Sequence, residues 1–244
     1  MKTLIIIPSR LSATRLPGKP LLKINGLSMI SHVFKKAEEA NIGEVVVATE
    51  DQEIMDDVKK NGGQAILTEK DHKTGTDRIY EAFQKLNNKN IDLILNLQGD
   101  EPLMDIEDIR NLNNQMIKYQ SQFGTLAAKI KDKILYENEN IVKVCTKEQL
   151  DDLNFPKATN FTRKVLEQDK NIYHHLGIYC YSKEKLKEFV SYNQSSNEVK
   201  SRLEQLRALD NNIKINVALA KSSPIGVDTE EDFLAIKKIM EYKT

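Results

Sequence analysis

Short runs of apolar residues alternate along the chain with segments whose apolar residues recur at helical spacing. Residues 4–7, 45–48 and 93–95 are continuous apolar runs, as expected for strands that are buried on both faces of a parallel sheet. Three amphipathic stripes predict helices: Met29, Val33 and Ala37; Ile79, Phe83 and Leu86; and Ile106, Ile109, Leu112 and Met116. This alternation predicts an α/β fold with right-handed crossovers.

The pattern becomes less regular after about residue 120. It predicts strands at 125–130, 142–145, 178–181 and 213–220, and helices at 197–209 and 229–242. Thr229, followed three residues later by Asp232, fits a cap at the start of the last helix. No repeat and no Gly/Ser/Pro-rich linker divides the chain. We therefore predict one mixed, mostly parallel sheet with flanking helices, in a single domain over residues 1–244.

Composition narrows the function classes. The 36 Lys and Arg residues balance the 36 Asp and Glu residues, which argues against a broad electrostatic surface for nucleic acid or anionic lipid. Cys145 and Cys180 have no metal-ligand or CxxC spacing, which is typical of free thiols in a reducing compartment. No apolar run approaches the roughly 18–20 residues of a membrane span, and the run at 4–7 is too short for a signal peptide. We expect a soluble, cytoplasmic protein with no nucleic-acid or membrane partner.

A cationic segment follows the first predicted strand. Arg10, Arg15 and Lys19 lie within ten residues, together with hydroxyl side chains and a Pro17-Gly18 turn. In open α/β sheets ligands bind at the carboxyl ends of the strands, and Arg and Lys side chains suit phosphate groups. The segment matches neither a Walker loop nor a GxGxxG fingerprint. We interpret it as a triphosphate-binding loop.

Acidic residues follow two other predicted strands. Asp100 and Glu101 come after the third apolar run, and Asp228 follows the strand predicted at 213–220. Taken singly, the first pair could belong to a turn and Asp228 could be the N-cap of the last helix. Two carboxylates on separate strand-end loops that face a triphosphate would form a magnesium site, because Mg²⁺ prefers carboxylate and phosphate oxygens.

The remaining polar motifs leave more than one interpretation open. Thr74 and Gly75 open a predicted helix, where they could cap it or present N–H donors to a ligand. His174 and His175 precede a predicted strand, where a structural role is commoner than a catalytic one. No spacing supports a zinc site, and no serine nucleophile elbow is present.

Eight blocks, in order along almost the whole chain, are similar to one known family. They are residues 6–10 (IIPSR), 15–21 (RLPGKPL), 47–49 (VAT), 74–78 (TGTDR), 98–102 (QGDEP), 175–179 (HLGIY), 203–207 (LEQLR) and 227–232 (VDTEED). The chain resembles the 3-deoxy-manno-octulosonate (Kdo) cytidylyltransferases, the CMP-Kdo synthetases of lipopolysaccharide synthesis.

The resemblance implies a nucleotide-diphosphosugar-transferase-like α/β fold in a homodimer that uses CTP and Mg²⁺. The implied reaction joins CTP and Kdo to give CMP-Kdo and diphosphate. Within the single domain, residues 1–120 would mainly bind the nucleotide, and residues 121–244 would mainly bind the sugar and form the dimer.

The resemblance also assigns roles to individual residues. The nucleotide would contact Pro8, Arg10, Arg15, Lys19, Thr74, Gly75, Arg78 and Gln98. Lys19, Arg15, Asp100 and Asp228 would be catalytic, with Lys19 and Arg15 stabilising the departing diphosphate. Asp100 and Asp228 would hold the Mg²⁺ that brings the 2-hydroxyl of the sugar to the α-phosphorus. The sugar would contact Gln98, Arg163, His175, Tyr179, Glu204 and Gln205.

One stretch departs from the family pattern. Around residues 158–166 the family has an aromatic pair before Ser-Arg and then Ala-x-Ile-Pro, whereas here only Phe161 and Arg163 are retained. This difference concerns the sugar more than cytidylyl transfer, so a related acidic sugar, such as 8-amino-Kdo or a sialic-acid-like sugar, is an alternative substrate. A catalytically silent nucleotide-binding regulator is a third reading, and the intact Lys19, Asp100 and Asp228 argue against it.

Overall fold

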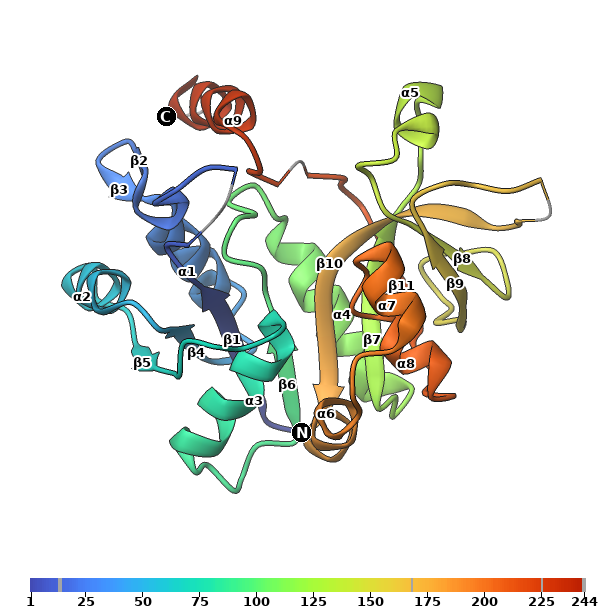
Figure 1. Ribbon diagram of the computed structural model, residues 1–244, viewed down its shortest axis with the longest axis horizontal. Coiled ribbons are helices and arrows are strands. Elements are labelled where there is room, and N and C mark those ends of the chain that lie inside the picture. The colour runs from blue at the N-terminus through green and yellow to red at the C-terminus, as the bar shows by residue number, and fades with distance from the viewer. Residues whose placement is uncertain (13–14, 168, 225, 243–244) are drawn as a thin grey trace. The chain divides into compact units, whose positions relative to one another are not determined.

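The computed structural model describes residues 1–12, 15–167, 169–224 and 226–242 (Figure 1). It contains two compact units. We call Lys2–Ile109 with Pro224–Thr244 the terminal unit, and Arg110–Ser223 the central unit. The expectation of a single domain whose halves meet near residue 120 stays a prediction.

The terminal unit is built on four parallel strands. They are β1 (Thr3–Ser9), β4 (Gly43–Thr49), β5 (Ala65–Leu67) and β6 (Leu93–Asn96), in the order β6-β1-β4-β5. The three apolar runs of the sequence form β1, β4 and β6, and their apolar side chains are at most 5% exposed. β5 was not predicted, because it has only three residues and none of them is buried.

Three helices cover the two faces of these strands. They are α1 (Met29–Glu39), α2 (Gln52–Lys60) and α3 (Gly75–Leu86). The chain runs β1-α1-β4-α2-β5 in one direction across the sheet, and α3 then returns it to β6 on the other side of β1. Right-handed crossovers therefore place α1 and α2 on one face and α3 on the opposite face.

Glycine contacts show which face of the sheet two residues near the carboxyl end of β1 point to. A Cβ on Gly75 would lie 3.5 Å from Pro8, so Pro8 faces α3. A Cβ on Gly99 would lie 3.1 Å from Ile30 of α1 and 3.5 Å from Ile7, so Ile7 faces α1. Because the connections from the sheet diverge between β1 and β6, a crevice is expected at the carboxyl ends of these two strands.

A small apolar cluster anchors the segment that follows β1. The segment contains the short helix η1 (Lys19–Leu21) and the hairpin β2 (Lys23–Ile24) and β3 (Leu27–Ser28). Ile24 packs with Phe233 and Ile236 of α9 (Glu230–Tyr242) and with Val227, and Leu16 and Leu22 join them. The cluster therefore holds the cationic segment and the chain around residue 227 together.

The central unit has a mixed sheet. Its strands are β7 (Phe123–Ala128), β8 (Lys143–Thr146), β9 (Ala158–Thr162), β10 (Ile172–Ser182) and β11 (Asn216–Ala220). β11 pairs with β7 in parallel, whereas the pairs β7–β10, β10–β8 and β8–β9 are antiparallel. Its own helices are α5 (Lys133–Glu137), α6 (Lys183–Ser191), α7 (Ser196–Ser201) and α8 (Leu206–Asp210), and α4 (Ile106–Lys118) begins in the terminal unit.

The prediction of one helix over 197–209 was wrong, because the chain breaks it into α7 and α8. Arg202 adopts a left-handed conformation with φ 52° at the end of α7. The turn lets Glu198 form a buried bidentate ion pair with Arg207, with N···O distances of 2.9 and 2.7 Å. One straight helix would place these two residues on different faces, since they are nine positions apart.

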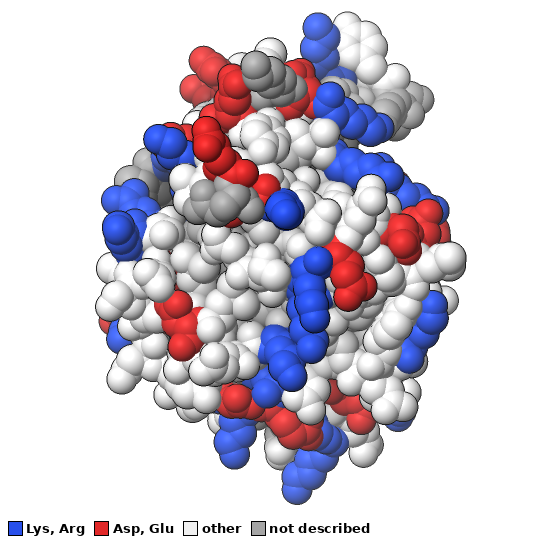
Figure 2. All heavy atoms as spheres, turned by 90° about the vertical axis from the view of Figure 1, so that its right-hand side faces the viewer, with Lys and Arg blue, Asp and Glu red and all other residues white. Residues whose placement is uncertain are grey.

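The structure confirms the predicted mixed α/β class with flanking helices. Cys145 and Cys180 are buried free thiols, and burial raises the pKa of Cys145 to about 11. None of the described helices is long and apolar enough to span a membrane. On the face seen in Figure 2, basic and acidic side chains both occur, with uncharged surface between them.

Candidate active site

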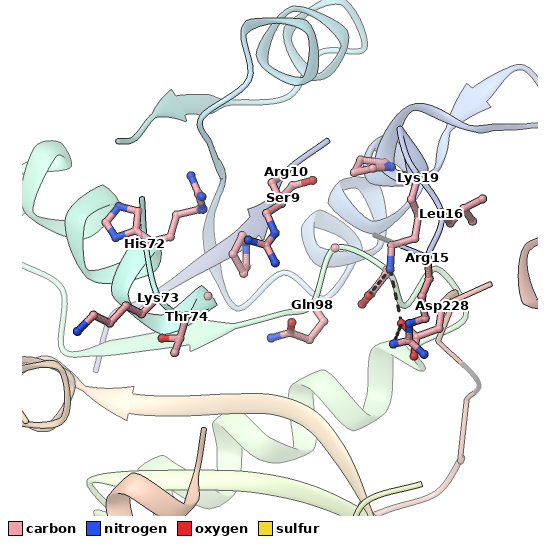
Figure 3. A pocket seen from close by; sticks show the side chains of 16 residues that line it. Ser9, Arg10, Arg15, Leu16, Lys19, His72, Lys73, Thr74, Gln98 and Asp228 are labelled. Carbon is pink, nitrogen blue, oxygen red and sulfur yellow. Dashed lines mark hydrogen bonds and ion pairs between the residues drawn. The ribbon is translucent and has the colours of Figure 1, made fainter. Parts of the chain in front are cut away.

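A cavity of about 370 Å³ opens at the carboxyl ends of β1 and β6, within the terminal unit. The ten predicted nucleotide and metal residues all line it: Pro8, Arg10, Arg15, Lys19, Thr74, Gly75, Arg78, Gln98, Asp100 and Asp228. Figure 3 shows His72, Lys73 and Thr74 at one end and Arg15, Lys19 and Asp228 at the other. We call these the α3 end and the charged end.

The charged end is a network of ion pairs. Lys19 Nζ lies 2.7 Å from Asp100 Oδ2 and 3.9 Å from Asp228 Oδ1. Arg15 Nη2 lies 3.0 Å from Asp228 Oδ1, as the dashed lines in Figure 3 show. The Lys19 side chain is only 13% exposed, against 63% for Arg15. Two carboxylates from distant parts of the sequence therefore converge on one ammonium group.

Local backbone structure fixes this arrangement. Gly18 takes a left-handed conformation with φ 69° immediately before η1, which most other residues would strain to adopt. Lys19, the first residue of η1, then extends to the Val227 carbonyl and donates to it at 2.6 Å. Val227 N donates to the Asp100 carbonyl at 2.9 Å. The loop after β6 and the chain before α9 are thus tied together at the backbone as well as through Lys19.

Asp228 is not used to cap the last helix. Thr229 and Asp232 form that cap, with Asp232 N donating to Thr229 Oγ1 at 3.2 Å and Thr229 N donating to Asp232 Oδ2 at 2.8 Å. The capping pair predicted from the sequence is confirmed. It leaves the Asp228 carboxylate for the cavity, which decides between the two readings that the sequence left open.

Glu101 adds a third acidic group beside this network. Its pKa is raised to about 8, chiefly by burial and also by the negative charges of Asp100 and Asp228. Its Oε2 atom is buried and has no hydrogen-bond partner within the described ranges. At neutral pH Glu101 is therefore mainly protonated, and the charges of Asp100 and Asp228 are balanced by Arg15 and Lys19.

The carboxylates of Asp100 and Asp228 fit a hard divalent cation such as Mg²⁺. No group of three or more His, Cys, Asp or Glu side chains among the described residues could hold a metal ion. Mg²⁺, however, is usually bound by one or two carboxylates together with substrate phosphates and water. Asp100 and Asp228 supply two such carboxylates, and the buried Glu101 Oε2 beside them has no hydrogen-bond partner among the described residues.

The α3 end is built by the start of that helix. Thr74 and Asp77 form a capping box: Asp77 N donates to Thr74 Oγ1 at 3.3 Å, and Thr74 N donates to Asp77 Oδ2 at 3.1 Å. The Thr74 side chain is therefore engaged in capping. Gln98, whose Nε2 donates to Asn96 Oδ1 at 2.8 Å, lies between the two ends in the view of Figure 3.

Arg78 lines the cavity with its guanidinium already engaged. The residue is 3% exposed and donates to Thr68 Oγ1 at 2.6 Å, to the Glu69 carbonyl at 3.2 Å and to the Glu50 carboxylate. Arg78 thereby links the start of α3 to Glu50, which follows β4, and to Thr68, which follows β5. Its predicted contact with the base stays a prediction.

The six predicted sugar-binding residues fall in different units. Gln98 belongs to the terminal unit, whereas the central unit contains Arg163, His175, Tyr179, Glu204 and Gln205. In the central unit, Tyr179 Oη donates to Gln205 Oε1 at 3.1 Å, and the His175 ring lies 5.5 Å from the Tyr179 ring and 4.9 Å from Phe161. Glu204 adjoins Gln205 in the chain. The structure thus brings His175, Tyr179 and Gln205 into one cluster.

The protonation of His175 follows from its surroundings. Burial lowers its pKa to about 3, and the charge of His174 acts in the same direction. The Thr125 hydroxyl donates its only proton to the Ile178 carbonyl at 2.7 Å, so at the 3.0 Å contact His175 Nε2 must be the donor. His175 is therefore neutral, with Nδ1 left as a hydrogen-bond acceptor.

Arg163 is held by main-chain carbonyls. Its guanidinium donates to Ser201 O at 3.4 Å, to Glu139 O at 3.3 Å and to Asn140 O at 3.2 Å. The carbonyl of Arg163 in turn accepts a 2.9 Å hydrogen bond from the buried Lys143. None of these hydrogen bonds involves the His175 cluster, so the role of Arg163 with the sugar stays a prediction.

Several lining residues were missed by the sequence analysis. They are Ser9, Leu16, His72, Lys73, Pro20 and Gly99. Ser9 and Gly99 adjoin predicted residues at strand ends, so their positions were available as a signal. His72 is half-buried and contacts Glu81, an i+9 contact that the turn before α3 creates and that no periodicity indicates.

Comparison with known proteins supports this reading of the site. A family model described as cytidylyltransferase matches residues 4–215. The 3-deoxy-manno-octulosonate cytidylyltransferase of Afipia carboxidovorans is 41% identical over 98% of this chain and 96% of its own. That of Rhodopseudomonas palustris strain BisB18 is 41% identical over 99% and 98%.

Solved structures agree. A structure of CMP:2-keto-3-deoxy-manno-octonic acid synthetase complexed with CTP is 33% identical, covers 100% of both chains and superposes with a TM-score of 0.89. UDP-glucose pyrophosphorylase complexed with UDP-glucose, at 14% identity and a TM-score of 0.73, shares the fold. The full-length similarity, together with the convergence of Lys19, Asp100 and Asp228, places this chain in the 3-deoxy-manno-octulosonate cytidylyltransferase family.

Proposed function

We propose that the protein transfers CMP from CTP to the anomeric 2-hydroxyl of Kdo, giving CMP-Kdo and diphosphate, and so activates Kdo for lipopolysaccharide synthesis. The observation that carries the proposal is the charged end of the cavity, where Lys19 meets Asp100 and Asp228 at the carboxyl edge of the sheet. The names of the full-length relatives support the same reaction.

The cations of the cavity would stabilise the leaving group. Diphosphate departs with added negative charge, and Arg and Lys placed in advance lower the barrier because they need not reorganise during the step. Lys19 is suited to this role, since two hydrogen bonds fix its ammonium in a site that is 13% exposed. Arg15, which is 63% exposed, would close on the triphosphate from solvent.

Asp100 and Asp228 would hold the magnesium ion. When bound, such an ion neutralises phosphate charge and favours the ionised form of an attacking hydroxyl. The two aspartates would exchange their ion pairs with Lys19 and Arg15 for the metal as those cations turn to the phosphates. This exchange keeps the charged end near balance throughout binding.

Sugar recognition would use the central unit and Gln98. His175 is neutral with Nδ1 as an acceptor, so it suits a sugar hydroxyl and is a poor proton donor at neutral pH. Tyr179 and Gln205 form one hydrogen-bonded pair beside it. We include Arg163 and Glu204 in this pocket on the strength of the family motifs.

The test is diphosphate release from purified protein supplied with CTP, Kdo and Mg²⁺, with each component omitted in turn. Release that requires all three supports the proposal, and no release under these conditions refutes it. Parallel reactions with 8-amino-Kdo and a sialic acid test the sugar, because residues 158–166 depart from the family pattern. Faster release with either sugar would replace Kdo as the substrate.

A homodimer and a cytoplasmic location are part of the proposal. CTP is an intracellular nucleotide, and both cysteines are free thiols, as in reducing compartments. Sedimentation at micromolar concentration measures the oligomeric state, and a monomer would contradict the first of these two statements.

A further inference from the structure

Ser9 ends β1 and lines the cavity, and its hydroxyl has an unusual environment. The residue is 8% exposed, and its Oγ atom is buried without a hydrogen-bond partner in the described portion of the chain. Buried hydroxyls are nearly always hydrogen-bonded, because an unpaired one loses its bonds to water and gains none in exchange. An exception at the wall of a binding cavity points to a ligand.

Other buried hydroxyls of the terminal unit are satisfied. Ser31 Oγ donates to Asp57 Oδ2 at 3.0 Å, Thr49 Oγ1 accepts from Asp51 N at 3.1 Å, and Thr68 Oγ1 accepts from Arg78 at 2.6 Å. These three hydroxyls belong to residues outside the lining of the cavity. The unpaired hydroxyl of Ser9 is therefore not a general feature of this unit.

The geometry of β1 shows toward which face of the sheet the Ser9 side chain points. Alternate residues of a strand point to the same face, so Ser9 shares the face of Ile7, which is the face covered by α1. The short helix η1, which carries Lys19, also packs against α1. The Ser9 hydroxyl thus lies on the side of the phosphate-binding cations and on the face opposite to α3.

We propose that Ser9 Oγ donates a hydrogen bond to a phosphate oxygen of the bound nucleotide. The inference rests on the proposed function, in which CTP occupies this cavity. Ser9 adjoins Arg10 in the chain and lines the same cavity as Arg15 and Lys19, and Lys and Arg side chains offer donors only, so these cations provide no acceptor for the hydroxyl proton. A phosphate oxygen is the acceptor that these cations would bring there, and a hydrogen bond to a charged acceptor is a strong one.

Isothermal titration of Ser9→Ala with CTP, cytidine and inorganic tripolyphosphate tests the inference. We expect the dissociation constant for CTP and for tripolyphosphate to rise about 10-fold, as expected for a lost hydrogen bond to a charged group. Binding of cytidine should be unchanged. The melting temperature of the free variant should be equal to or above that of the wild type, because the substitution removes an unpaired buried hydroxyl.

Ser31→Ala is the matched control, since Ser31 is buried to 2% exposure and its hydroxyl is paired with Asp57. It should lower the melting temperature and leave the CTP dissociation constant unchanged. Unchanged CTP binding by Ser9→Ala, or an equal loss with cytidine, would overturn the inference. If the wild type fails to bind CTP but binds tripolyphosphate, with loss in Ser9→Ala, the proposed function fails and the Ser9 contact stands. If the wild type binds neither, both fail.

Discussion

Individual side chains in the cavity are held by charge balance. Lys19 is shared by Asp100, Asp228 and the Val227 carbonyl, and the neighbouring Glu101 keeps its proton because burial and the two aspartates raise its pKa to about 8. Each acidic residue thus takes the charge state that its neighbours permit. Removal of one carboxylate should therefore affect metal and turnover more than it affects folding.

Replacement of Asp100 by Asn tests this assignment. The amide still accepts a hydrogen bond from Lys19 but supplies no negative charge to a metal ion. We expect turnover to fall by at least about 100-fold, a loss of roughly 2.7 kcal/mol or more in transition-state stabilisation. CTP binding and the melting temperature should change little. Steady-state kinetics and calorimetry measure both.

Asp92→Asn is the control for Asp100→Asn. Asp92 accepts a hydrogen bond from Lys2 N at 2.7 Å and lies outside the lining of the cavity. It should keep turnover within about twofold of the wild type. Near-normal turnover of Asp100→Asn would remove that residue from the mechanism.

His175 carries a second prediction at the residue scale. Its pKa is lowered to about 3 in the folded protein, chiefly by burial, from about 6.5 in the unfolded chain. Below pH 6.5 the unfolded chain therefore binds more protons at this site, so stability falls as the pH falls. The loss approaches about 1.4 kcal/mol per pH unit until the folded pKa is reached.

Urea unfolding of the wild type and His175→Gln between pH 4.5 and 7.5 measures this loss. The glutamine amide retains a donor for Thr125 but does not titrate. The variant should lose less stability than the wild type as the pH falls. Parallel curves for the two proteins would show that His175 does not contribute to the pH dependence.

The paired parallel strands of the terminal unit bring the loops of the site together at one edge of the sheet. β1 and β4 run side by side in register from Thr3–Gly43 to Ser9–Thr49, so both deliver their carboxyl ends to the same edge. β1 and β6 pair in the same way and bring the loops after Ser9 and Asn96 together. A disturbance at the amino end of β4 should therefore reach the cavity through β1.

Gly43→Ala tests the pairing of β1 with β4. A Cβ at this position would lie 1.8 Å from the Thr3 carbonyl oxygen, which belongs to the backbone and cannot rotate away. We expect the free energy of unfolding to fall by about 3 kcal/mol, at the upper end of the cost of overpacking. Chemical denaturation measures the change.

Gly75→Ala provides the comparison for stability alone. Its added Cβ would meet Pro8 at 3.5 Å, an ordinary van der Waals contact at the start of α3. The free energy of unfolding should stay within about 0.5 kcal/mol of the wild type. Equal stability of the two variants would contradict the close approach of β4 to Thr3.

The whole molecule couples nucleotide binding to stability. With 36 basic and 36 acidic residues it has no net charge to attract an anion from a distance. Attraction for CTP must therefore come from the local cations of the cavity. Because the ligand binds the folded protein only, it should stabilise the whole chain by mass action.

Thermal unfolding with CTP measures this coupling. At 100 times its dissociation constant, CTP with Mg²⁺ should add about 2.7 kcal/mol and raise the melting temperature by roughly 5–11 °C, at 2–4 °C for each kcal/mol. Lys19→Met should lose most of this shift at the same CTP concentration. Lys23→Met, an exposed lysine outside the cavity, should retain it. Equal shifts in both variants would exclude Lys19 from nucleotide binding.

The sequence by itself determined the strands β1, β4 and β6, the cationic segment after β1 and the family of the chain. It could do so because buried parallel strands are continuous apolar runs, and because the chemistry of a strand-end loop is local in sequence. The family motifs likewise placed ten residues that line one cavity. The sequence did not predict β5, because this strand has only three residues and none of them is buried. It also did not predict the break between α7 and α8, because the left-handed Arg202 and the ion pair between Glu198 and Arg207 depend on the fold.

Only the tertiary structure decided the state of the functional side chains. Asp228 faces the cavity because Thr229 and Asp232 already cap α9, and Glu101 is neutral because packing removes water from its carboxyl group. Ser9 became a candidate nucleotide-binding residue only when its hydroxyl proved buried and unpaired within the described residues. Desolvation and long-range pairing depend on neighbours far away in the chain, so they cannot be predicted from the order of the residues alone.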